Sequence, residues 1–506
     1  MRDDPVVVIG AGIGGLAAAT TLAAAGRSVV VIERAARAGG KLHALEVGDC
    51  AVDAGPTVLT LRDVFDELCA AGGARLEDHV ALEPLSLLAR HAWPDGTRLD
   101  LQTETAANVA AIGAFAGSAA ARGYARFAHD AAAMFATLEH SYLRAARPDP
   151  LTLTRRLGWR RLGELFAIRP FTTLWRALGD YFADPRLRQL FGRYATYCGS
   201  SPYLAPATLM LIAHVEQRGV WRVTGGMRGL ADALVAVARA CGAEFHFGHA
   251  VSRIDTRAGR ASGVTLADGR YLAASAVIAN ADGAALARGD FGAAARRALP
   301  ALAPHERSLS ALTWVGRAHT DGLPLAHHTV CFSGDYAAEF DDLLVRGRPP
   351  RAPTVYLCAQ DRDGNGRRAH ADATDERLLI LINAPADADR RTPDDAALAW
   401  HARRTALALR RCGLTLDPRG AALHCSTPAD FAHRFDGPGG AIYGRATHGW
   451  AAAFRRPGAR SALPGLYLAG ASVHPGPGLP MVALSGRLAA AAVLEDSAAA
   501  VRARRA

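Results

Sequence analysis

The chain has 506 residues, of which half are hydrophobic and 21% are charged. This length predicts about three ordinary domains or two large ones, and the composition excludes a disordered chain and a multi-span membrane protein. The formal net charge is +10, yet Lys41 is the one lysine among 58 basic residues. Because the arginines are spread along the whole chain, the charge does not indicate a nucleic-acid surface.

The eight cysteines form no Cys-x-x-Cys pair, so their spacing predicts neither a zinc nor an iron–sulfur site, and we expect no metal. Free thiols in a large core are typical of a reducing compartment, and the N-terminus lacks the features of a signal peptide. The uncharged stretch 5–26 contains a glycine turn, and the stretch 194–215, apart from one histidine also uncharged, contains two prolines. We therefore expect no transmembrane helix in either stretch.

The first element has the pattern of a dinucleotide-binding unit. Residues 6–9 are continuously apolar, as in a strand buried on both faces, and a Gly-x-Gly-x-x-Gly turn follows at Gly10, Gly12 and Gly15. A helical pattern and a second strand lead to Glu33, which is placed to accept a hydrogen bond from a ribose hydroxyl. The helix N-terminus offers amide donors to phosphates.

Two further glycine-containing segments follow before residue 60. Gly39 and Gly40 precede Lys41, and the sequence Asp-Ala-Gly-Pro-Thr occupies residues 53–57. Nicotinamide-binding folds have no need of a second glycine pair at this place, although an ordinary turn would also explain it. The arrangement resembles the flavin-binding region of the FAD-dependent amine oxidase and phytoene desaturase superfamily.

Two later segments match the same superfamily. Residues 224–254 predict a helix followed by two strands, and residues 263–266 and 276–279 predict more strands. Residues 465–486 predict a strand, a glycine turn and a helix that starts near Pro480, a residue suited to a first helical turn. The resemblance implies that this helix N-terminus faces the flavin ring and that the backbone at Val251 meets the adenine.

The resemblance therefore implies an α/β fold, with a Rossmann-like doubly wound FAD-binding domain and an inserted α+β substrate domain. The FAD-binding domain would be discontinuous and comprise 1–85, 224–290 and 460–506. The substrate and membrane-associating domain would comprise 86–223 and 291–459. The cofactor-binding residues it implies are Gly10, Gly12, Gly15, Glu33, Gly40, Lys41, Pro56, Thr57, Val251, Gly470, Ala471, Met481 and Val482.

Segments 53–68, 73–85 and 470–490 resemble the bacterial carotenoid desaturases, and most of all the hydroxyneurosporene (methoxyneurosporene) desaturase subfamily. This resemblance implies an enzyme that introduces the C-3,4 double bond into 1-hydroxy carotenoids by hydride transfer to flavin. Three alternatives stay open: a phytoene desaturase acting at other positions, a non-catalytic lipid escort protein of the same ancestry, and an amine oxidase. The electron acceptor, oxygen or a quinone, is open as well.

Removal of a hydride next to a polyene leaves a delocalised cation, so the following proton loss needs only a weak base or water. His474 is the side chain we expect nearest the flavin ring that could take this proton, and its alternative role is to order the loop. Thr57 and Arg62 are candidates to line the ring or the mouth of the substrate tunnel.

An apolar C40 substrate resides in a bilayer, so we expect a cytoplasmic protein that is peripheral on the inner face of the membrane. Residues 155–182 interleave arginines with aromatic residues at helical spacing, which fits either an interfacial helix or an ordinary core-facing helix. The residues of this pattern are Arg155, Arg156, Trp159, Arg160, Arg161, Leu162, Leu165, Phe166, Arg169, Phe171, Leu174, Trp175, Arg176, Leu178, Tyr181 and Phe182.

Overall fold

The computed structural model describes residues 4–48, 50–158, 168–368, 375–417 and 423–505. Among these residues, five parallel strands form a sheet in the order β10-β2-β1-β14-β21. Its central strand β1 is fully buried, as its continuous apolar run predicts. The strands are β1 (Val6–Ile9), β2 (Val29–Glu33), β10 (Glu244–Phe247), β14 (Ala276–Ala279) and β21 (Leu466–Leu468).

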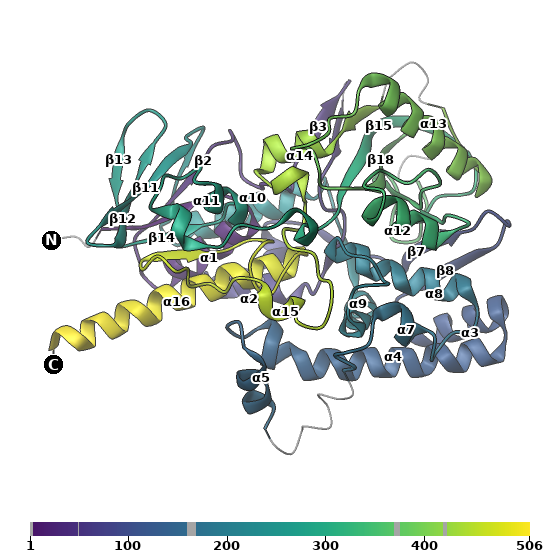
Figure 1. Cartoon of the computed structure of the whole chain (residues 1–506), viewed down its shortest axis with the longest axis horizontal. Coiled ribbons are helices and arrows are strands. Elements are labelled where there is room, and N and C mark those ends of the chain that lie inside the picture. Colours follow the sequence, from purple (N-terminus) through teal and green to yellow (C-terminus); the bar gives the residue numbers. More distant parts are fainter. Residues whose placement is uncertain (1–3, 49, 159–167, 369–374, 418–422, 506) are drawn as a thin grey trace.

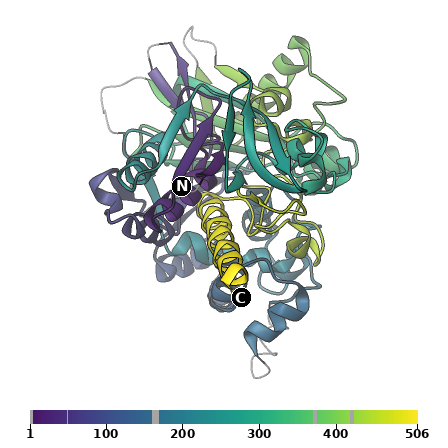
Figure 2. The same ribbon diagram turned by 90° about the vertical axis from the view of Figure 1, so that its left-hand side faces the viewer.

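Helices α1 (Ile13–Ala24), α10 (Arg228–Ala240) and α16 (Leu479–Arg505) pack together against this sheet, and α16 projects from the body of the molecule (Figures 1 and 2). The contact between α1 and α16 is close because small residues face each other there. A Cβ added to Gly486 would lie 2.0 Å from the carbonyl oxygen of Gly14. The N-terminal and C-terminal segments are therefore joined in one layer, and the predicted α/β fold is confirmed.

A small antiparallel sheet lies beside the parallel one, at the upper left of Figure 1. Two of its strands fall where the sequence predicted strands after residue 250. It consists of β11 (Val251–Arg257), β12 (Arg260–Leu266) and β13 (Tyr271–Ala273). The other short strands are β3 (Ala44–Val47) paired with β4 (Cys50–Asp53), and β9 (Val220–Val223) between β5 (Leu59–Thr60) and β6 (Leu82–Pro84).

A larger, mostly antiparallel sheet occupies the other half of the molecule. Its strands come from two regions of the chain, 87–102 and 310–426, so both predicted insertions contribute to it. The domain boundaries themselves stay a prediction. In chain order the strands are β7 (Leu87–Ala92), β8 (Arg98–Gln102), β15 (Ser310–Gly322), β16 (His328–Cys331), β17 (Val355–Ala359), β18 (Asp375–Ala384), β19 (Leu414–Asp417) and β20 (His424–Ser426).

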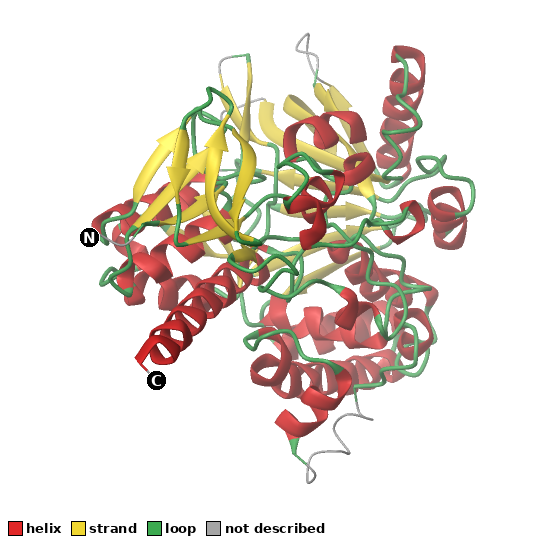
Figure 3. Ribbon diagram, turned by 60° about the vertical axis from the view of Figure 1, so that its left-hand side comes forward, coloured by secondary structure: helices red, strands yellow, loops and turns green. Residues whose placement is uncertain are grey.

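Figure 3 shows many of the helices gathered in the lower part of the molecule, below the strands. Those between residues 105 and 217 are α3 (Thr105–Ala116), α4 (Ser118–Leu138), α5 (Pro150–Leu157), α7 (Leu174–Leu178), α8 (Pro185–Gly192) and α9 (Leu211–Gln217), with a π-helical turn at Glu139–Leu143. The others are α2 (Asp63–Ala71), α11 (Gly283–Arg288), α12 (Tyr336–Leu344), α13 (Asp395–Arg411), α14 (Pro428–Phe435) and α15 (Ala452–Arg455).

The residues of the predicted interfacial pattern at 155–182 do not all have the same surroundings in the structure. Trp159, Arg160, Arg161, Leu162, Leu165 and Phe166 lie outside the described residues. Tyr181 and Phe182 are core residues that pack edge-on against Phe127, so they are not available as membrane anchors. Phe171, by contrast, is 75% exposed. In the described part of the chain no helix is both long enough and apolar enough to cross a bilayer.

Candidate functional site

A cavity of about 1110 Å³ runs between the parallel sheet, the larger sheet and the helical region. It exceeds the range of roughly 300–1,000 Å³ that is usual for a single small-molecule pocket. One end is lined by the glycine turns and is rich in backbone polar groups, whereas another arm is lined by apolar side chains. The cavity therefore has room for a dinucleotide and for a second, long and apolar ligand.

The first glycine turn forms one wall of this cavity at the end of β1. Gly10 has a φ of +92°, a conformation that favours glycine, and Gly10, Gly12 and Ile13 line the cavity. Gly15 has a packing role, because an added Cβ would lie 2.0 Å from the carbonyl oxygen of Gly10. The N-terminus of α1 consequently opens toward the cavity with its first N–H groups, which is an arrangement that suits phosphate.

Glu33 lies at the end of β2, beside the same turn. Its Oε2 accepts a hydrogen bond from the backbone N–H of Ala11 at 2.6 Å, and its Oε1 accepts one from the N–H of Ala35 at 2.8 Å. The carboxylate is buried but lines the cavity. These two bonds fix its orientation and leave lone pairs for a ribose hydroxyl.

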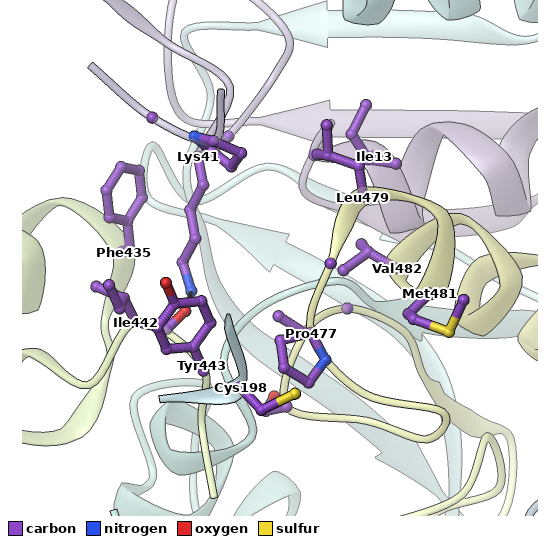
Figure 4. Close-up of a pocket in the computed structure, with 18 of the residues that line it drawn as sticks. Ile13, Lys41, Cys198, Phe435, Ile442, Tyr443, Pro477, Leu479, Met481 and Val482 are labelled. Carbon is purple, nitrogen blue, oxygen red and sulfur yellow. Dashed lines mark hydrogen bonds between the residues drawn. The ribbon is translucent and has the colours of Figure 1, made fainter. Parts of the chain in front are cut away.

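Lys41 extends from the second glycine pair across the cavity wall to a distant segment of the chain. Its Nζ donates a hydrogen bond to the carbonyl oxygen of Ile442 at 2.6 Å and lies 5.9 Å from the centroid of the Phe435 ring (Figure 4). Burial lowers the pKa of the Lys41 ammonium, and the nearby Asp282 carboxylate opposes this effect. The cation therefore ties the turn at 39–42 to the segment at 435–443.

The segment at 53–57 is held from both sheets. The Asp53 carboxylate accepts a hydrogen bond from the backbone N–H of Met227 at 2.7 Å, and the Asp53 backbone exchanges two bonds with the Gln360 side-chain amide. Gly55 packs so closely that an added Cβ would lie 1.8 Å from the Lys41 carbonyl oxygen. Pro56 and Thr57 are thereby presented to the cavity.

The loop from Gly470 to Leu479 brings the N-terminus of α16 to the cavity. The N–H of Gly470 donates to Oγ of Ser485 at 2.8 Å, and the buried Arg456 donates to the Ala471 carbonyl oxygen at 3.1 Å. Met481 and Val482, in the first turn of α16, line the cavity, and Figure 4 shows them beside Pro477. Ser485 and Arg456 were not predicted, because nothing in their local sequence shows that they meet the loop.

His474 does not belong to the cavity lining, although Pro475 does. Its Nε2 lies 3.0 Å from the Tyr142 carbonyl oxygen and 2.9 Å from that of Ala145, so Nε2 carries the proton and donates to both. Burial lowers the pKa of the imidazole to about 4. This geometry is that of the loop-ordering role, and it does not support the predicted role as a base.

Arg62 also lies apart from the cavity lining. Its guanidinium pairs with Asp66 and Glu77 and stacks over the Trp221 ring at 4.9 Å. The structure therefore does not support the expectation that Arg62 lines the flavin ring or the tunnel mouth, because two carboxylates close in sequence hold the partly exposed side chain elsewhere.

Every other predicted site residue except Gly15 lines this one cavity, although the three contributing segments are far apart in the chain. The residues brought together are Gly10, Gly12, Glu33, Gly40, Lys41, Pro56, Thr57, Val251, Gly470, Ala471, Met481 and Val482.

The apolar arm is built from the helical region between residues 138 and 215, together with α15 and its neighbours. No pattern in this region predicted a tunnel, since its apolar residues have the spacing of ordinary core-facing helices. Polar side chains of the same region, among them Arg193, Tyr197 and Glu216, also line the cavity. The apolar side chains that line this arm are Leu138, Tyr142, Leu143, Leu153, Ile168, Pro170, Leu209, Leu211, Ile212, Val215, Trp450, Ala453 and Phe454.

A buried polar group that sequence spacing did not indicate lies behind Thr57. Tyr356 forms a 2.6 Å hydrogen bond with the Thr57 hydroxyl and a 2.8 Å bond with Nδ1 of His328. The ligand atoms of His327, His328 and Cys358 lie within 4.8 Å of one another. Adjacent strands β16 and β17 bring them together, which a search for ligand spacing along the chain could not find.

Comparison with known proteins gives the family. Residues 13–314 match the family model for flavin-containing amine oxidoreductases. The chain is 48% identical to a hydroxyneurosporene desaturase of Rubrivivax gelatinosus over all of this chain and 96% of that protein. It is 28% identical to a 1-hydroxycarotenoid 3,4-desaturase of a Flavobacterium species, over 96% of this chain and 98% of the other.

A putrescine oxidase structure matches 97% of this chain and 99% of its own with a TM-score of 0.59 at 15% identity, which shows a shared fold. The glycine-lined cradle, the carboxylate at the end of β2 and the two helix N-termini fit an FAD molecule, and FAD is the cofactor of this fold family. Together with the identity over the full length, these findings show that the chain belongs to the flavin-containing amine oxidoreductases and, within them, to the hydroxyneurosporene desaturases.

Proposed function

We propose that the chain is an FAD-dependent desaturase that introduces the C-3,4 double bond into 1-hydroxy carotenoids such as 1-hydroxyneurosporene. The observation behind this proposal is a single cavity that joins a dinucleotide cradle to a long apolar arm. Most side chains of that arm are apolar, which suits a polyamine or other charged amine poorly. A rod-shaped isoprenoid would fill it.

Bound FAD supplies the oxidation, namely acceptance of a hydride from the C–H bond next to the polyene. The chain's own residues hold and orient the two molecules. Gly10, Gly12 and the N-terminus of α1 would receive the pyrophosphate, and Glu33 would accept from the ribose. The N-terminus of α16 at Met481 and Val482 would place positive partial charge beside the ring, which favours its reduced, anionic form.

The arm between α4, α5 and α9 would hold the substrate and keep water out. Most of its lining side chains are apolar, and its buried carboxylate, Glu216, already accepts hydrogen bonds from Tyr194 and Tyr197. The charge left by hydride loss would therefore stay delocalised on the polyene. The proton then leaves from the neighbouring carbon. Since that carbon is strongly acidified, water or another weak base is enough to accept the proton, and we assign no protein side chain to this step.

We further propose that the protein docks on the inner face of the membrane through the surface at the outer end of the cavity's apolar arm. Leu151 is 59% exposed, Phe171 75% and Trp450 49%, and the rings of Phe171 and Trp450 lie 5.5 Å apart. Arg155 and Arg156 are exposed on the neighbouring helix α5, at the bottom of Figure 1. An apolar patch next to cations suits an anionic lipid surface.

This membrane proposal is tested by sedimentation with anionic liposomes. We expect the variant Leu151→Asp/Phe171→Asp to remain in the supernatant while the wild-type protein sediments. The variant Val345→Asp, in which a 78% exposed residue after α12 is changed, is the matched control and should sediment. Equal sedimentation of all three proteins would refute docking through this patch.

The decisive experiment for function is product analysis with purified, flavin-containing protein. 1-Hydroxyneurosporene should gain one double bond at C-3,4, whereas phytoene should be recovered unchanged. Conversion of phytoene would instead favour a phytoene desaturase, and a colourless protein without FAD would favour an escort protein. Running the reaction without oxygen, with and without an added quinone, identifies the acceptor, for which we propose oxygen or a quinone.

A further inference from the structure

Three residues that line the cavity beneath the larger sheet each carry a buried polar atom without a hydrogen-bond partner among the described residues. The atoms are Oγ1 of Thr313 on β15, the hydroxyl of Tyr336 on α12 and Oε1 of Glu339 one helical turn further along α12. All three residues are more than nine-tenths buried. Within the part of the chain that the structure describes, none of these atoms has a hydrogen-bond partner.

Unpaired buried polar atoms are destabilising, and folded proteins contain few of them. A group of three in one cavity wall therefore indicates an occupant that brings a polar group of its own. The Glu339 carboxyl is already held on one side, because its Oε2 accepts from the backbone N–H of Thr354 at 3.2 Å and from the Thr354 hydroxyl at 2.7 Å. The Asn383 side chain also lies beside this carboxyl, and Oε1 remains without a hydrogen-bond partner among the described residues.

This polar group lies close to the flavin end of the cavity. Tyr356, which is bonded to Thr57, is two residues after Thr354 in the extended segment that enters β17, so the two side chains share a face about 7 Å apart along the strand. Thr313 lies in the same row as Tyr356, since both are paired with Leu381 of β18. Thr313 and, through Thr354, Glu339 are thus associated with the face of the sheet that carries Tyr356, the hydrogen-bond partner of the predicted flavin contact Thr57.

The proposed substrate carries its hydroxyl at the place this geometry requires. In a 1-hydroxy carotenoid, carbon C-1 is two bonds from C-3, where the new double bond begins. When C-3 and C-4 lie at the flavin, the hydroxyl must lie a few ångströms beyond it, and the rest of the apolar rod must extend in the other direction.

We propose that Thr313, Tyr336 and Glu339 form the closed polar end of the cavity that binds the C-1 hydroxyl of the substrate and thereby selects hydroxylated carotenoids. This inference rests on the proposed function. An apolar end group would leave the three polar atoms unpaired, and a site built to hydrogen-bond a hydroxyl discriminates strongly against a ligand that lacks it.

The test compares a 1-hydroxy carotenoid with its deoxy analogue, in which hydrogen replaces the hydroxyl, on the flavin-containing protein. The variants Thr313→Val and Tyr336→Phe remove hydroxyls that have no partner in the free protein, so folding and FAD content should be retained. We expect each variant to lower the ratio of kcat/KM for the two substrates about tenfold, through the hydroxylated substrate alone. Ser310→Ala is the control.

Ser310 is suited to this control because it lies on the same strand β15 and its buried hydroxyl also lacks a described partner, but it is not part of the cavity lining. The proposal is overturned if the ratio is unchanged in Thr313→Val and Tyr336→Phe, if both substrates lose activity equally, or if Ser310→Ala has the same effect. It is also overturned if the wild-type protein does not distinguish the two carotenoids.

Failure of the proposed function would be recognised separately. If neither carotenoid is desaturated, their equilibrium binding to the flavin-containing protein, followed by quenching of tryptophan fluorescence, still tests the pocket. Tighter binding of the hydroxylated compound that is lost in Tyr336→Phe would support a hydroxyl site in a protein of another activity. Equal binding of both compounds would refute the site as well.

Discussion

Replacing Lys41 by methionine should weaken FAD binding, because it breaks a contact between two walls of the cavity. Methionine keeps the length and much of the apolar bulk of the side chain but has no ammonium group. The variant therefore loses the 2.6 Å bond from Nζ to the Ile442 carbonyl oxygen and the interaction with the Phe435 ring. Segment 435–443 must then be ordered by the cofactor itself.

The size of the effect follows from the lost contact. A hydrogen bond from a charged donor contributes about 1.5–3 kcal/mol, and burial of the ammonium, which lowers its pKa, offsets part of this. If ordering the segment is added to the cost of binding, the Kd for FAD should rise about ten- to a hundredfold. Lys41→Arg retains the cation and its donors, and its Kd should stay within about threefold of the wild-type value.

The assay is titration of apoprotein with FAD, followed by quenching of flavin fluorescence, with thermal unfolding as a check that both apoproteins are folded. A Kd for Lys41→Met within a factor of about two of wild type would refute the tether. An arginine variant as weak as the methionine variant would show that the compact ammonium is required and that charge alone does not suffice.

Three further outcomes are expected. Gly55→Ala should abolish FAD retention, since its Cβ would lie 1.8 Å from the Lys41 carbonyl oxygen. The control Gly229→Ala should retain FAD, because its Cβ would meet nothing closer than 3.5 Å. Absorbance at the flavin band measures the FAD content of both variants. His474→Ala should lower the thermal midpoint while leaving kcat per bound flavin and its pH profile unchanged. Loss of an acidic limb, the fall in rate at low pH, would restore the role as a base. Burial raises the pKa of Glu339 from 4.5 to about 7, so the folded protein binds the proton more tightly, and this stabilisation is complete below pH 4.5 and disappears as the pH rises through 7. The stabilisation that the Glu339 proton contributes amounts to about 3 kcal/mol. The thermal midpoint of Glu339→Gln, relative to that of the wild-type protein, should therefore rise between pH 5 and pH 8. A difference in midpoint that does not change with pH would contradict this prediction.

The cofactor half of the molecule was predictable because its requirements are local. A buried parallel strand needs a continuous apolar run, and a tight turn beside phosphate needs glycine, so residues 6–33 show both in sequence. The match of three distant segments to one family then indicated that they meet. Val251 and Met481 could be placed at the cavity only through that resemblance, since nothing in their neighbours specifies a ligand.

The substrate half was not predictable for a physical reason. Thr313 on β15 and Glu339 on α12 line one cavity only because of the tertiary fold, and neither residue stands out in its own segment. His474 shows the opposite error: its position in a flavin motif suggested proton transfer, but burial and two carbonyl acceptors decide its role. Tyr181 and Phe182 likewise have the sequence spacing of membrane-anchoring residues, but they are packed in the hydrophobic core.

The late position in the chain of β21, the last strand of the parallel sheet, and of helix α16, which packs on that sheet, has a consequence for biosynthesis. Because translation proceeds from the N-terminus, the turn at Gly10 leaves the ribosome long before β21 and α16 exist, and the close packing of Gly14 on Gly486 forms only at the end. A nascent chain that does not yet contain α16 therefore has no complete cradle, and flavin incorporation must follow synthesis of that helix. Yellow colour would accordingly mark chains that contain α16, and chains cut before Leu466 would be colourless despite an intact glycine motif.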